Sequence, residues 1–321
     1  MADARMHVVF GAGQIGPLLA AKLRDAGQRV RVVRRSPTPV PVEGIEALHG
    51  DATDPAFVAE ATRGAAVVYH CINSPYFAKV WAETLPRIQA NLIFGAGKAG
   101  ARLVVLDNLY AYGRTHGRPM DEQTPLAPCS RKGEIRARLS EDLAAAAKRG
   151  EVRVVVGRAS DFFGPGAWAG SFLGAPFWPR VLAGKSGILL FDPDVRHTYH
   201  FSRDVAAGLA ALGLDAGAEG LWMLPCQTAQ TTRELVARCE RALGRPIEIR
   251  RLPRAALAAL GLLVPQVREL SEMAYQWEEP FVVDDARFRA RFTDLSTPLD
   301  EAAAQTVDYA REMVGRKRAP V

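Results

Sequence analysis

The sequence predicts an α/β fold, a doubly wound parallel sheet followed by a smaller C-terminal lobe. The first half of the chain alternates short apolar runs with helical patterns. This alternation is typical of parallel strands that are covered on both faces and joined by right-handed crossovers. After about residue 160 the pattern loosens into glycine-, proline- and aromatic-rich stretches between isolated helices. We therefore expect a first domain over 1–160, and over 161–321 mainly a separate lobe with returning elements of the sheet.

Each expected element follows from its local pattern. Near-continuous apolar runs predict six strands, at 6–11, 29–35, 44–51, 65–72, 101–108 and 151–160. Apolar positions at helical spacing predict four helices between them, at 14–27, 54–64, 76–99 and 131–149. Asp54 is expected to cap the second helix, because its carboxylate can accept backbone N–H groups and Pro55 suits the first helical position.

Composition and charge indicate which kinds of binding partner to expect. The 321 residues carry a formal net charge of +6, and the pI is near 9.3. The arginines are scattered, however, and the one dense basic run, at 315–321, is typical of a solvated tail. We therefore expect anionic small molecules rather than nucleic acid as partners. No apolar stretch is long enough to cross a membrane, so no membrane partner is expected.

The cysteines predict a reduced protein without a metal site. They are far apart and lack metal-binding spacing: Cys71, Cys129, Cys226 and Cys239. Reduced thiols are typical of the cytoplasm, and the N-terminus has no signal-peptide pattern. The predicted location is therefore cytoplasmic.

The segment GAGQIG at 11–16 matches the pattern G-x-G-x-x-G. It follows the first predicted strand and opens the first predicted helix, as a dinucleotide-binding turn must. Gly11 allows the tight turn, Gly13 lets the backbone approach a diphosphate, and Gly16 allows the helix to pack closely on the strand. The sheet is thus predicted to be of the Rossmann type, with the phosphates at the helix N-terminus. An ordinary strand–helix turn is the alternative.

Arg34 and Arg35 end the second predicted strand. An acidic residue there would bind the adenosine ribose hydroxyls of NAD, whereas a guanidinium matches the 2′-phosphate of NADP in charge and geometry. The sequence therefore favours NADP as the cofactor. NAD remains possible if one arginine is only a solvated strand end.

Seven segments in order resemble the short-chain dehydrogenase/reductase superfamily, and within it the extended and atypical NAD-dependent epimerase/dehydratase-like group. After the glycine motif they are HGDATD (49–54), YHCIN (69–73), YAYG (110–113), EQTPLAP (122–128), GRASDFFGPG (157–166) and DVAAGL (204–209). The resemblance implies a cofactor site formed by Gly11, Gly13, Gln14, Ile15, Gly16, Arg34, Arg35, Asp51, Ala52, Cys71 and Asn73. In such a site Asp51 would reach the adenine, and the segment around Cys71 would pass beneath the cofactor.

The chain departs from this family at the residues that carry the chemistry. Asn108 stands where the family has its catalytic serine or threonine, and Lys132 and Arg136 stand where it has Tyr-x-x-x-Lys. The asparagine of the sixth-strand segment is replaced by Asp161. His197 stands where nucleotide-sugar members have a diphosphate-binding arginine, so we do not expect a nucleotide-sugar substrate.

These departures leave four catalytic candidates. In the related enzymes the tyrosine passes a proton to or from the reacting oxygen beside the cofactor. Lys132 and Arg136 are four residues apart on one helix, so Lys132 could act as the acid and Arg136 could hold the ribose. Asn108 could orient a carbonyl, and Tyr110 is a candidate if its side chain faces the cleft. The alternative is that Lys132 and Arg136 are solvated residues of a charged helix.

The segment 161–185, rich in aromatic residues and glycine, lies where the family has its substrate-binding insertion. We expect it to form a mobile apolar lid, unless its aromatic residues pack the core of the smaller lobe. His197, Tyr199 and His200 are polar candidates for the rim of the cleft.

Three functions stay open. The first is an NADP-dependent oxidoreductase that acts on a small, partly apolar carbonyl or hydroxyl compound. The second is an epimerase or dehydratase that uses the cofactor transiently. The third is a non-catalytic NADP(H)-binding sensor or regulatory protein, which the missing tyrosine favours and the substrate segment disfavours. Each has a small-molecule partner, and the protein is expected to be a monomer or a homodimer.

Overall fold

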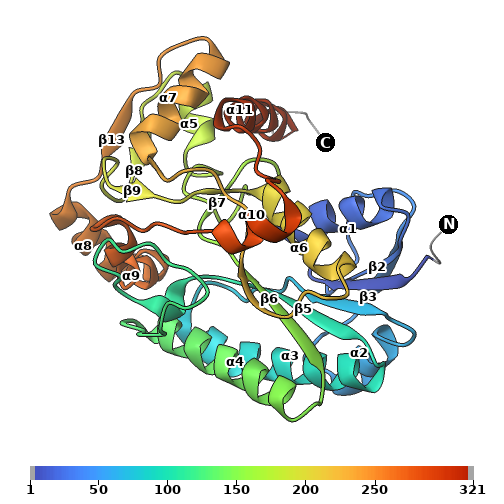
Figure 1. Ribbon diagram of the computed structural model, residues 1–321. Coiled ribbons are helices and arrows are strands. Elements are labelled where there is room, and N and C mark those ends of the chain that lie inside the picture. The colour runs from blue at the N-terminus through green and yellow to red at the C-terminus, as the bar shows by residue number, and fades with distance from the viewer. Residues whose placement is uncertain (1–3, 317–321) are drawn as a thin grey trace.

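A seven-stranded parallel sheet forms the centre of the computed structural model, which describes residues 4–316, with the backbone alone at 254, 255, 257, 258, 260 and 266 (Figure 1). The strand order is β11-β6-β5-β4-β1-β2-β3. The strands are β1 (Met6–Phe10), β2 (Arg29–Arg34), β3 (Glu46–His49), β4 (Val67–His70), β5 (Arg102–Asp107), β6 (Arg153–Arg158) and β11 (Gly220–Met223). All neighbouring pairs are parallel, which confirms the doubly wound sheet. The direction of winding reverses between β1 and β4, where such sheets bind ligands at their carboxyl edge.

Helices cover both faces of the sheet (Figure 1). One face carries α1 (Gly16–Asp25) and α6 (Ser202–Leu214), and the other carries α2 (Pro55–Ala61), α3 (Ala78–Lys98) and α4 (Arg131–Lys148). Asp54 caps α2 as predicted, because its side chain accepts two backbone N–H groups of the first turn. Ser130 caps α4 by accepting from the N–H of Gly133 at 3.1 Å. The four predicted helices are therefore confirmed.

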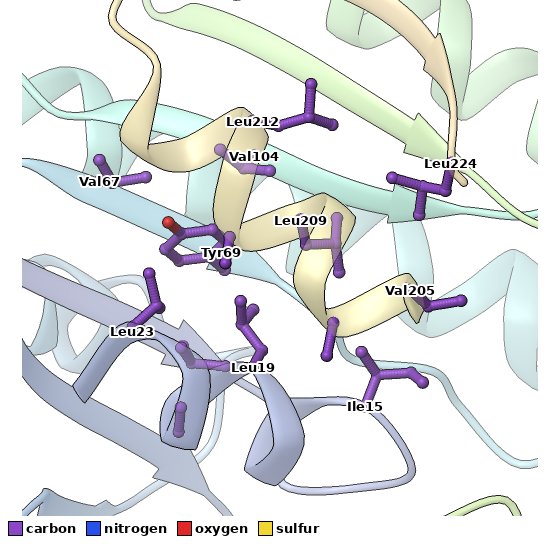
Figure 2. Close-up of a cluster of buried hydrophobic side chains, with 14 of the residues drawn as sticks. Ile15, Leu19, Leu23, Val67, Tyr69, Val104, Val205, Leu209, Leu212 and Leu224 are labelled. Atoms are coloured by element: carbon purple, nitrogen blue, oxygen red, sulfur yellow. The ribbon is translucent and has the colours of Figure 1, made fainter. Parts of the chain in front are cut away.

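The core between α1, α6 and the sheet is closely packed (Figure 2). Leu19 and Leu23 of α1 lie in one buried cluster with Leu209 of α6. Burying such a side chain stabilises the fold by roughly 1.5–3 kcal/mol. Tyr69 of β4 belongs to the same cluster, and its hydroxyl lies 3.0 Å from Nδ1 of His7. That hydrogen bond satisfies a polar group that would be costly to bury alone.

The smaller lobe comes from the second half of the chain. Its helices are α5 (Trp178–Leu182), α7 (Thr232–Leu243) and α11 (Leu299–Arg316), and α11 packs against the other two. Short strand pairs join β8 (Gly187–Leu189) to β13 (Ile249–Arg251) and β9 (Arg196–His197) to β12 (Gln230–Thr231). Thr231 and Glu234 form a reciprocal capping box at the start of α7, and Gly244, with a φ of 77°, ends it.

Further short elements connect the lobe to the sheet. They are the turn η1 (Tyr110–Tyr112), β7 (Phe162–Phe163), β10 (His200–Phe201), α8 (Arg254–Leu263), α9 (Pro265–Ser271), the turn η2 (Ala274–Trp277) and α10 (Ala286–Phe292). β7 pairs with β10 directly before α6, and α10 packs against β11. The second half of the chain thus reaches the carboxyl edge of the sheet.

The six predicted strands are confirmed, although most are shorter than their apolar runs. The seventh strand, β11, lies in the second half of the chain, where returning elements of the sheet are expected. Its position could not be predicted, because a run of four residues gives too little periodicity to distinguish it from a loop. The basic run at 315–321 lies largely outside the described residues. Within 4–316, no helix is both long and apolar enough to span a bilayer.

Candidate active site

The glycine-rich turn joins β1 to α1 at the carboxyl edge of the sheet. Gly11 has a φ of 110°, and its N–H donates to the carbonyl of Val33 at 2.9 Å. A Cβ on Gly11 would lie 2.7 Å from the carbonyl oxygen of Cys71, and one on Gly16 would lie 1.8 Å from that of Gly11. Neither position therefore accepts a side chain. A Cβ on Gly13 would meet nothing within 4 Å, so the space over this residue is open to an approaching diphosphate.

The start of α1 has no side-chain cap. Ile15 occupies the N-cap position, and its side chain is buried in the core. The first N–H groups of the helix thus lack the carboxylate or hydroxyl that usually satisfies them. Gln14 lies against a loop from the second half of the chain, since a Cβ on Gly166 would lie 2.4 Å from its carbonyl oxygen. The loop after β7 therefore borders the glycine-rich turn.

Polar residues follow β2 and β3 at the same edge. Arg34 is half-buried, and its guanidinium donates to a carbonyl of the following loop at 3.3 Å, whereas Arg35 is exposed. The pKa of Asp51 is lowered, chiefly by a backbone N–H that its carboxylate accepts and also by the charge of Arg35. Ala52, beside it, is buried. The structure therefore brings Arg35 and the Asp51 carboxylate within electrostatic reach of each other.

The segment after β4 borders the same turn. The N–H of Cys71 donates to the carbonyl of Phe10 at 2.8 Å. Burial raises the pKa of the Cys71 thiol to about 12, so the sulfur stays protonated and unreactive near neutral pH. Asn73 is exposed, and its side-chain oxygen accepts from Nη2 of Arg136 at 3.0 Å.

Lys132 lies on the first turn of α4 and is fully buried. Its Nζ donates to the Glu269 carboxylate, to the Glu269 carbonyl at 3.0 Å and to Oε1 of Glu272 at 2.7 Å. It also lies 4.6 Å from the centroid of the Tyr76 ring. These three acceptors use all three N–H bonds of an ammonium. The alternative of a solvated lysine is therefore wrong, and no proton of this group is left over for a substrate.

Glu269 is a residue that the sequence analysis missed. Burial acts to raise its pKa, but the hydrogen bonds from Lys132 and from the N–H of Ala78 outweigh it, so the pKa is lowered. This one carboxylate joins α9 to the starts of α3 and α4. No local pattern could have revealed it, because Lys132 is 137 residues away in the sequence.

Arg136 is buried as well, in a different set of contacts. Its Nη1 donates to Asp107 at 3.3 Å, and its guanidinium lies 4.7 Å from the centroid of the Trp81 ring. Arg158 donates to the other oxygen of Asp107 at 3.1 Å. Two guanidinium groups therefore hold the carboxylate at the end of β5, and Arg136 links it to Asn73. The solvated alternative is wrong for Arg136 too.

Asn108 and Tyr110 lie at the end of β5. The side-chain oxygen of Asn108 accepts from the N–H of Tyr110 at 3.1 Å, which begins the turn η1. The Tyr110 hydroxyl lies 3.2 Å from that of Tyr76, and its ring stacks on Trp81. Burial, and then the charge of Asp161, raises the pKa of Tyr110 above its ordinary value. Its phenol therefore stays protonated.

The aromatic segment divides between core and cavity. Four of its side chains are buried in the core of the smaller lobe, namely Phe163, Trp168, Phe177 and Trp178. The expectation of a mobile lid is therefore wrong for these four. Phe172 instead lines a cavity of about 270 Å³ together with Phe191 and Trp277, whose rings stack with centroids 4.5 Å apart.

The expected polar rim is wrong for His197 and His200, which are both fully buried. Tyr199 is nearly buried, but it lines the same cavity as Phe172. The Trp277 ring stacks on His197 at 5.2 Å between centroids, and Phe281 lies 5.4 Å away in the same way. The segment after α9 supplies this cover, which the sequence pattern around the histidines could not indicate.

A model of the NAD dependent epimerase/dehydratase family matches residues 7–219. The chain belongs to this family. Membership confirms the resemblance drawn from the seven segments, and the cofactor of the family is a nicotinamide dinucleotide. The family is one of NAD-dependent enzymes, which agrees with the expectation of an oxidoreductase or an epimerase/dehydratase.

Solved structures of this kind share the fold over nearly the whole chain. The Bordetella bronchiseptica enzyme WbmH in complex with NAD⁺ is 21% identical, covers 97% of this chain and 99% of its own, and has a TM-score of 0.75. A double mutant of the dTDP-glucose 4,6-dehydratase DesIV from Streptomyces venezuelae, with NAD and DAU bound, is 21% identical, with coverages of 97% and 98% and a TM-score of 0.79. The Thermus thermophilus UDP-glucose 4-epimerase complex with NAD is 20% identical, with coverages of 95% and 99% and a TM-score of 0.75. No curated protein matches the sequence.

Proposed function

We propose that this protein is an NADP-dependent oxidoreductase that acts on a small, partly apolar carbonyl or hydroxyl compound. The observation that carries the proposal is the pair Arg34 and Arg35 at the end of β2, where NAD-binding sheets have an acidic residue. The exposed guanidinium of Arg35 supplies charge and hydrogen-bond donors for a 2′-phosphate. NAD is the alternative.

We assign cofactor binding to Gly11, Gly13, Gln14, Ile15, Gly16, Arg34, Arg35, Asp51, Ala52, Cys71 and Asn73. The open space over Gly13 and the uncapped start of α1 fit a diphosphate. Asp51 would bind at the adenine end, and Cys71 and Asn73 would line the other end of the site. When bound, the dinucleotide supplies or accepts a hydride.

The apolar character of the substrate is supported by the cavity in the smaller lobe. Phe172, Phe191 and Trp277 give it an aromatic wall, and Arg180 and Thr232 add polar groups. Sites of this composition bind an apolar body and fix its orientation through a few polar atoms. A substrate with one carbonyl or hydroxyl group and one apolar end would use both features.

The four catalytic candidates differ in how many of their hydrogen-bonding groups are still free to contact a substrate. Tyr110 keeps a protonated phenol, Asn108 keeps its amide donors, and Arg136 orients Asn73 beside the proposed cofactor site. Lys132 remains a candidate acid only if its cluster with Glu269 opens, because its three donors are otherwise in use.

Two other functions remain candidates. A non-catalytic NADP(H) sensor is favoured by one observation: the residues in the places of the family's tyrosine and lysine are both held in buried ion pairs. A transient use of the cofactor, as in an epimerase or dehydratase, is favoured by the family itself.

Fluorescence titration with NADPH and NADH tests the cofactor assignment. We expect NADPH to bind at least about tenfold more tightly, a difference of about 1.4 kcal/mol. Equal affinities would overturn the role of Arg34 and Arg35. Loss of NADPH absorbance with benzaldehyde or acetophenone, two small carbonyl compounds with an apolar ring, then tests turnover. Tight NADPH binding without any turnover would favour the sensor.

A further inference from the structure

The buried imidazole of His197 contacts acceptors through both of its ring nitrogens. Nδ1 lies 3.2 Å from the backbone carbonyl oxygen of Gln276. Nε2 lies 2.8 Å from Oδ2 of Asp161 and 3.0 Å from the hydroxyl oxygen of Ser160. The ring is fixed in this position, because it stacks on Trp277 at an interplanar angle of 4°.

These contacts determine how many protons the pair holds. A carbonyl oxygen only accepts, so Nδ1 of His197 carries a hydrogen. An ionised carboxylate also only accepts, so a second proton must lie between Nε2 and Oδ2 of Asp161, on one atom or the other. Without that proton, two lone pairs would face each other at 2.8 Å in a buried site. Asp161 and His197 therefore form one proton-holding unit.

Only one end of this unit can be reached from outside. The His197 side chain is 0% exposed, whereas that of Asp161 is 21% exposed. Among the described residues, Oδ1 of Asp161 has no hydrogen-bond partner, while Oδ2 is engaged by the imidazole. A ligand that approached from solvent would thus meet the Asp161 carboxyl and not the histidine.

Asp161 also lies at the edge where the cofactor is proposed to bind. It follows the carboxyl end of β6 by three residues, and its loop continues to Gly166, which lies against Gln14 of the glycine-rich turn. After burial, the charge of Asp161 is the next contribution that raises the pKa of Tyr110. The carboxyl therefore lies within electrostatic reach of Tyr110 at the end of β5, on a loop that continues to the glycine-rich turn.

Within the described part of the chain, four titratable groups whose pKa Asp161 affects are neutral. Burial lowers the pKa of His200 to about 4, and its Nδ1 accepts from the N–H of Ser160 at 3.1 Å. Burial comes first among the causes that raise the pKa of Tyr76, Tyr110 and Tyr199, so these phenols stay protonated. None of them competes for the proton between Asp161 and His197.

We propose that Asp161 is the catalytic residue that transfers a proton to or from the reacting oxygen of the substrate, and that His197 is its positioning partner. The inference rests on the proposed oxidoreductase function. In it, Asp161 takes the role of general acid that the tyrosine has in the related enzymes. In reduction, an O–H bond on Oδ1 of Asp161, protonated from solvent at its exposed side, breaks and leaves its electron pair on the carboxylate, while a lone pair of the substrate oxygen forms the new O–H bond. The proton between Nε2 of His197 and Oδ2 stays in place and stabilises the carboxylate that results. Oxidation runs the same transfer in reverse.

The first test locates the proton without turnover. Protein labelled with ¹⁵N-histidine and ¹³C-aspartate and saturated with NADPH is compared with Asp161→Asn and with Asp194→Asn, a surface carboxyl paired with Arg233. We expect a proton shared by Nε2 of His197 and Asp161 in the wild type and in Asp194→Asn, and its loss in Asp161→Asn. An unprotonated Nε2 beside an ionised Asp161 in the wild type would overturn the proposal.

The second test measures turnover of benzaldehyde and acetophenone with NADPH. Asp161→Asn should lower kcat by roughly a hundredfold or more, as loss of an acid–base group does, with NADPH affinity unchanged. His197→Gln should lower kcat less and change the shape of its pH profile. A kcat in Asp161→Asn within twofold of Asp194→Asn would overturn the proposal, whereas equal binding of NADH and NADPH would overturn only the proposed cofactor. A wild type that binds NADPH, holds the shared proton and reduces neither compound would refute both.

Discussion

The start of α4 and the glycine-rich turn differ in how their polar groups are satisfied. At the start of α4, Lys132 has an acceptor for each of its three N–H bonds and is sealed from solvent. At the glycine-rich turn, the space over Gly13 is open and Arg35 is exposed. Saturated charges hold elements together, whereas open donors are free to bind a ligand. Substitutions at the start of α4 should therefore lower stability, and those at the glycine-rich turn should lower cofactor affinity.

The largest effect is expected for Lys132→Met. This change leaves Glu269 buried without its ammonium, and removal of one partner from a buried pair costs about 3–5 kcal/mol. Urea unfolding would measure the loss. Arg149→Met is the matched control, because it breaks the exposed pair with Glu151 and should change little. An unchanged free energy of unfolding in Lys132→Met would contradict the claim that the buried Lys132–Glu269 pair stabilises the fold.

Gly13→Asp, in the glycine-rich turn, should lower cofactor affinity and leave stability nearly unchanged. Its side chain would enter the open space and repel the phosphates, so NADPH affinity should fall roughly a hundredfold, or about 2.7 kcal/mol. The free energy of unfolding should hardly change, because a Cβ there meets nothing within 4 Å. Gly13→Asn introduces a side chain of the same shape without the charge. It therefore distinguishes electrostatic repulsion of the phosphates from steric obstruction by the side chain. Undiminished NADPH binding in the aspartate variant would place the diphosphate elsewhere.

Arg35→Ala should have a smaller and more selective effect. Loss of one guanidinium is expected to weaken NADPH binding by about tenfold, or about 1.4 kcal/mol, and to leave NADH binding unchanged. Fluorescence titration of both cofactors measures the ratio. Arg63→Ala, at an exposed pair with Glu60, is the control. Equal weakening of NADPH and NADH would show that Arg35 does not read the 2′-phosphate.

The smallest expected effect is a change in how steeply the free energy of unfolding depends on pH. The pKa of Glu269 is lowered in the folded protein, so its stabilising contribution is complete above the unfolded pKa and is lost as pH falls through the folded one. Below about pH 4.5, an ordinary glutamate value, wild-type stability should therefore fall more steeply than that of Lys132→Met. Buried His7, His70 and His200 have pKa values lowered from 6.5 to about 4, so they lower the stability of both proteins equally as pH falls through that range, mostly above the window of Glu269. Parallel unfolding curves across this range would contradict the pairing.

Six strands of the sheet, the glycine-rich turn and the family could be predicted from the sequence, because each depends on local periodicity or on a short contiguous motif. The sequence also located the places of the missing tyrosine and lysine. It could not say what Lys132 and Arg136 contact, since their acceptors come from α9 and from the ends of β4 and β5, far away in the chain.

Which polar residues are buried and saturated, and which are open to a ligand, could not be predicted before the fold was known. His197 and His200 belong at the rim by pattern alone, yet the aromatic side chains after α9 bury His197 and turn its imidazole toward Asp161. Burial and hydrogen-bond saturation depend on contacts between segments distant in sequence, and no local pattern encodes such contacts.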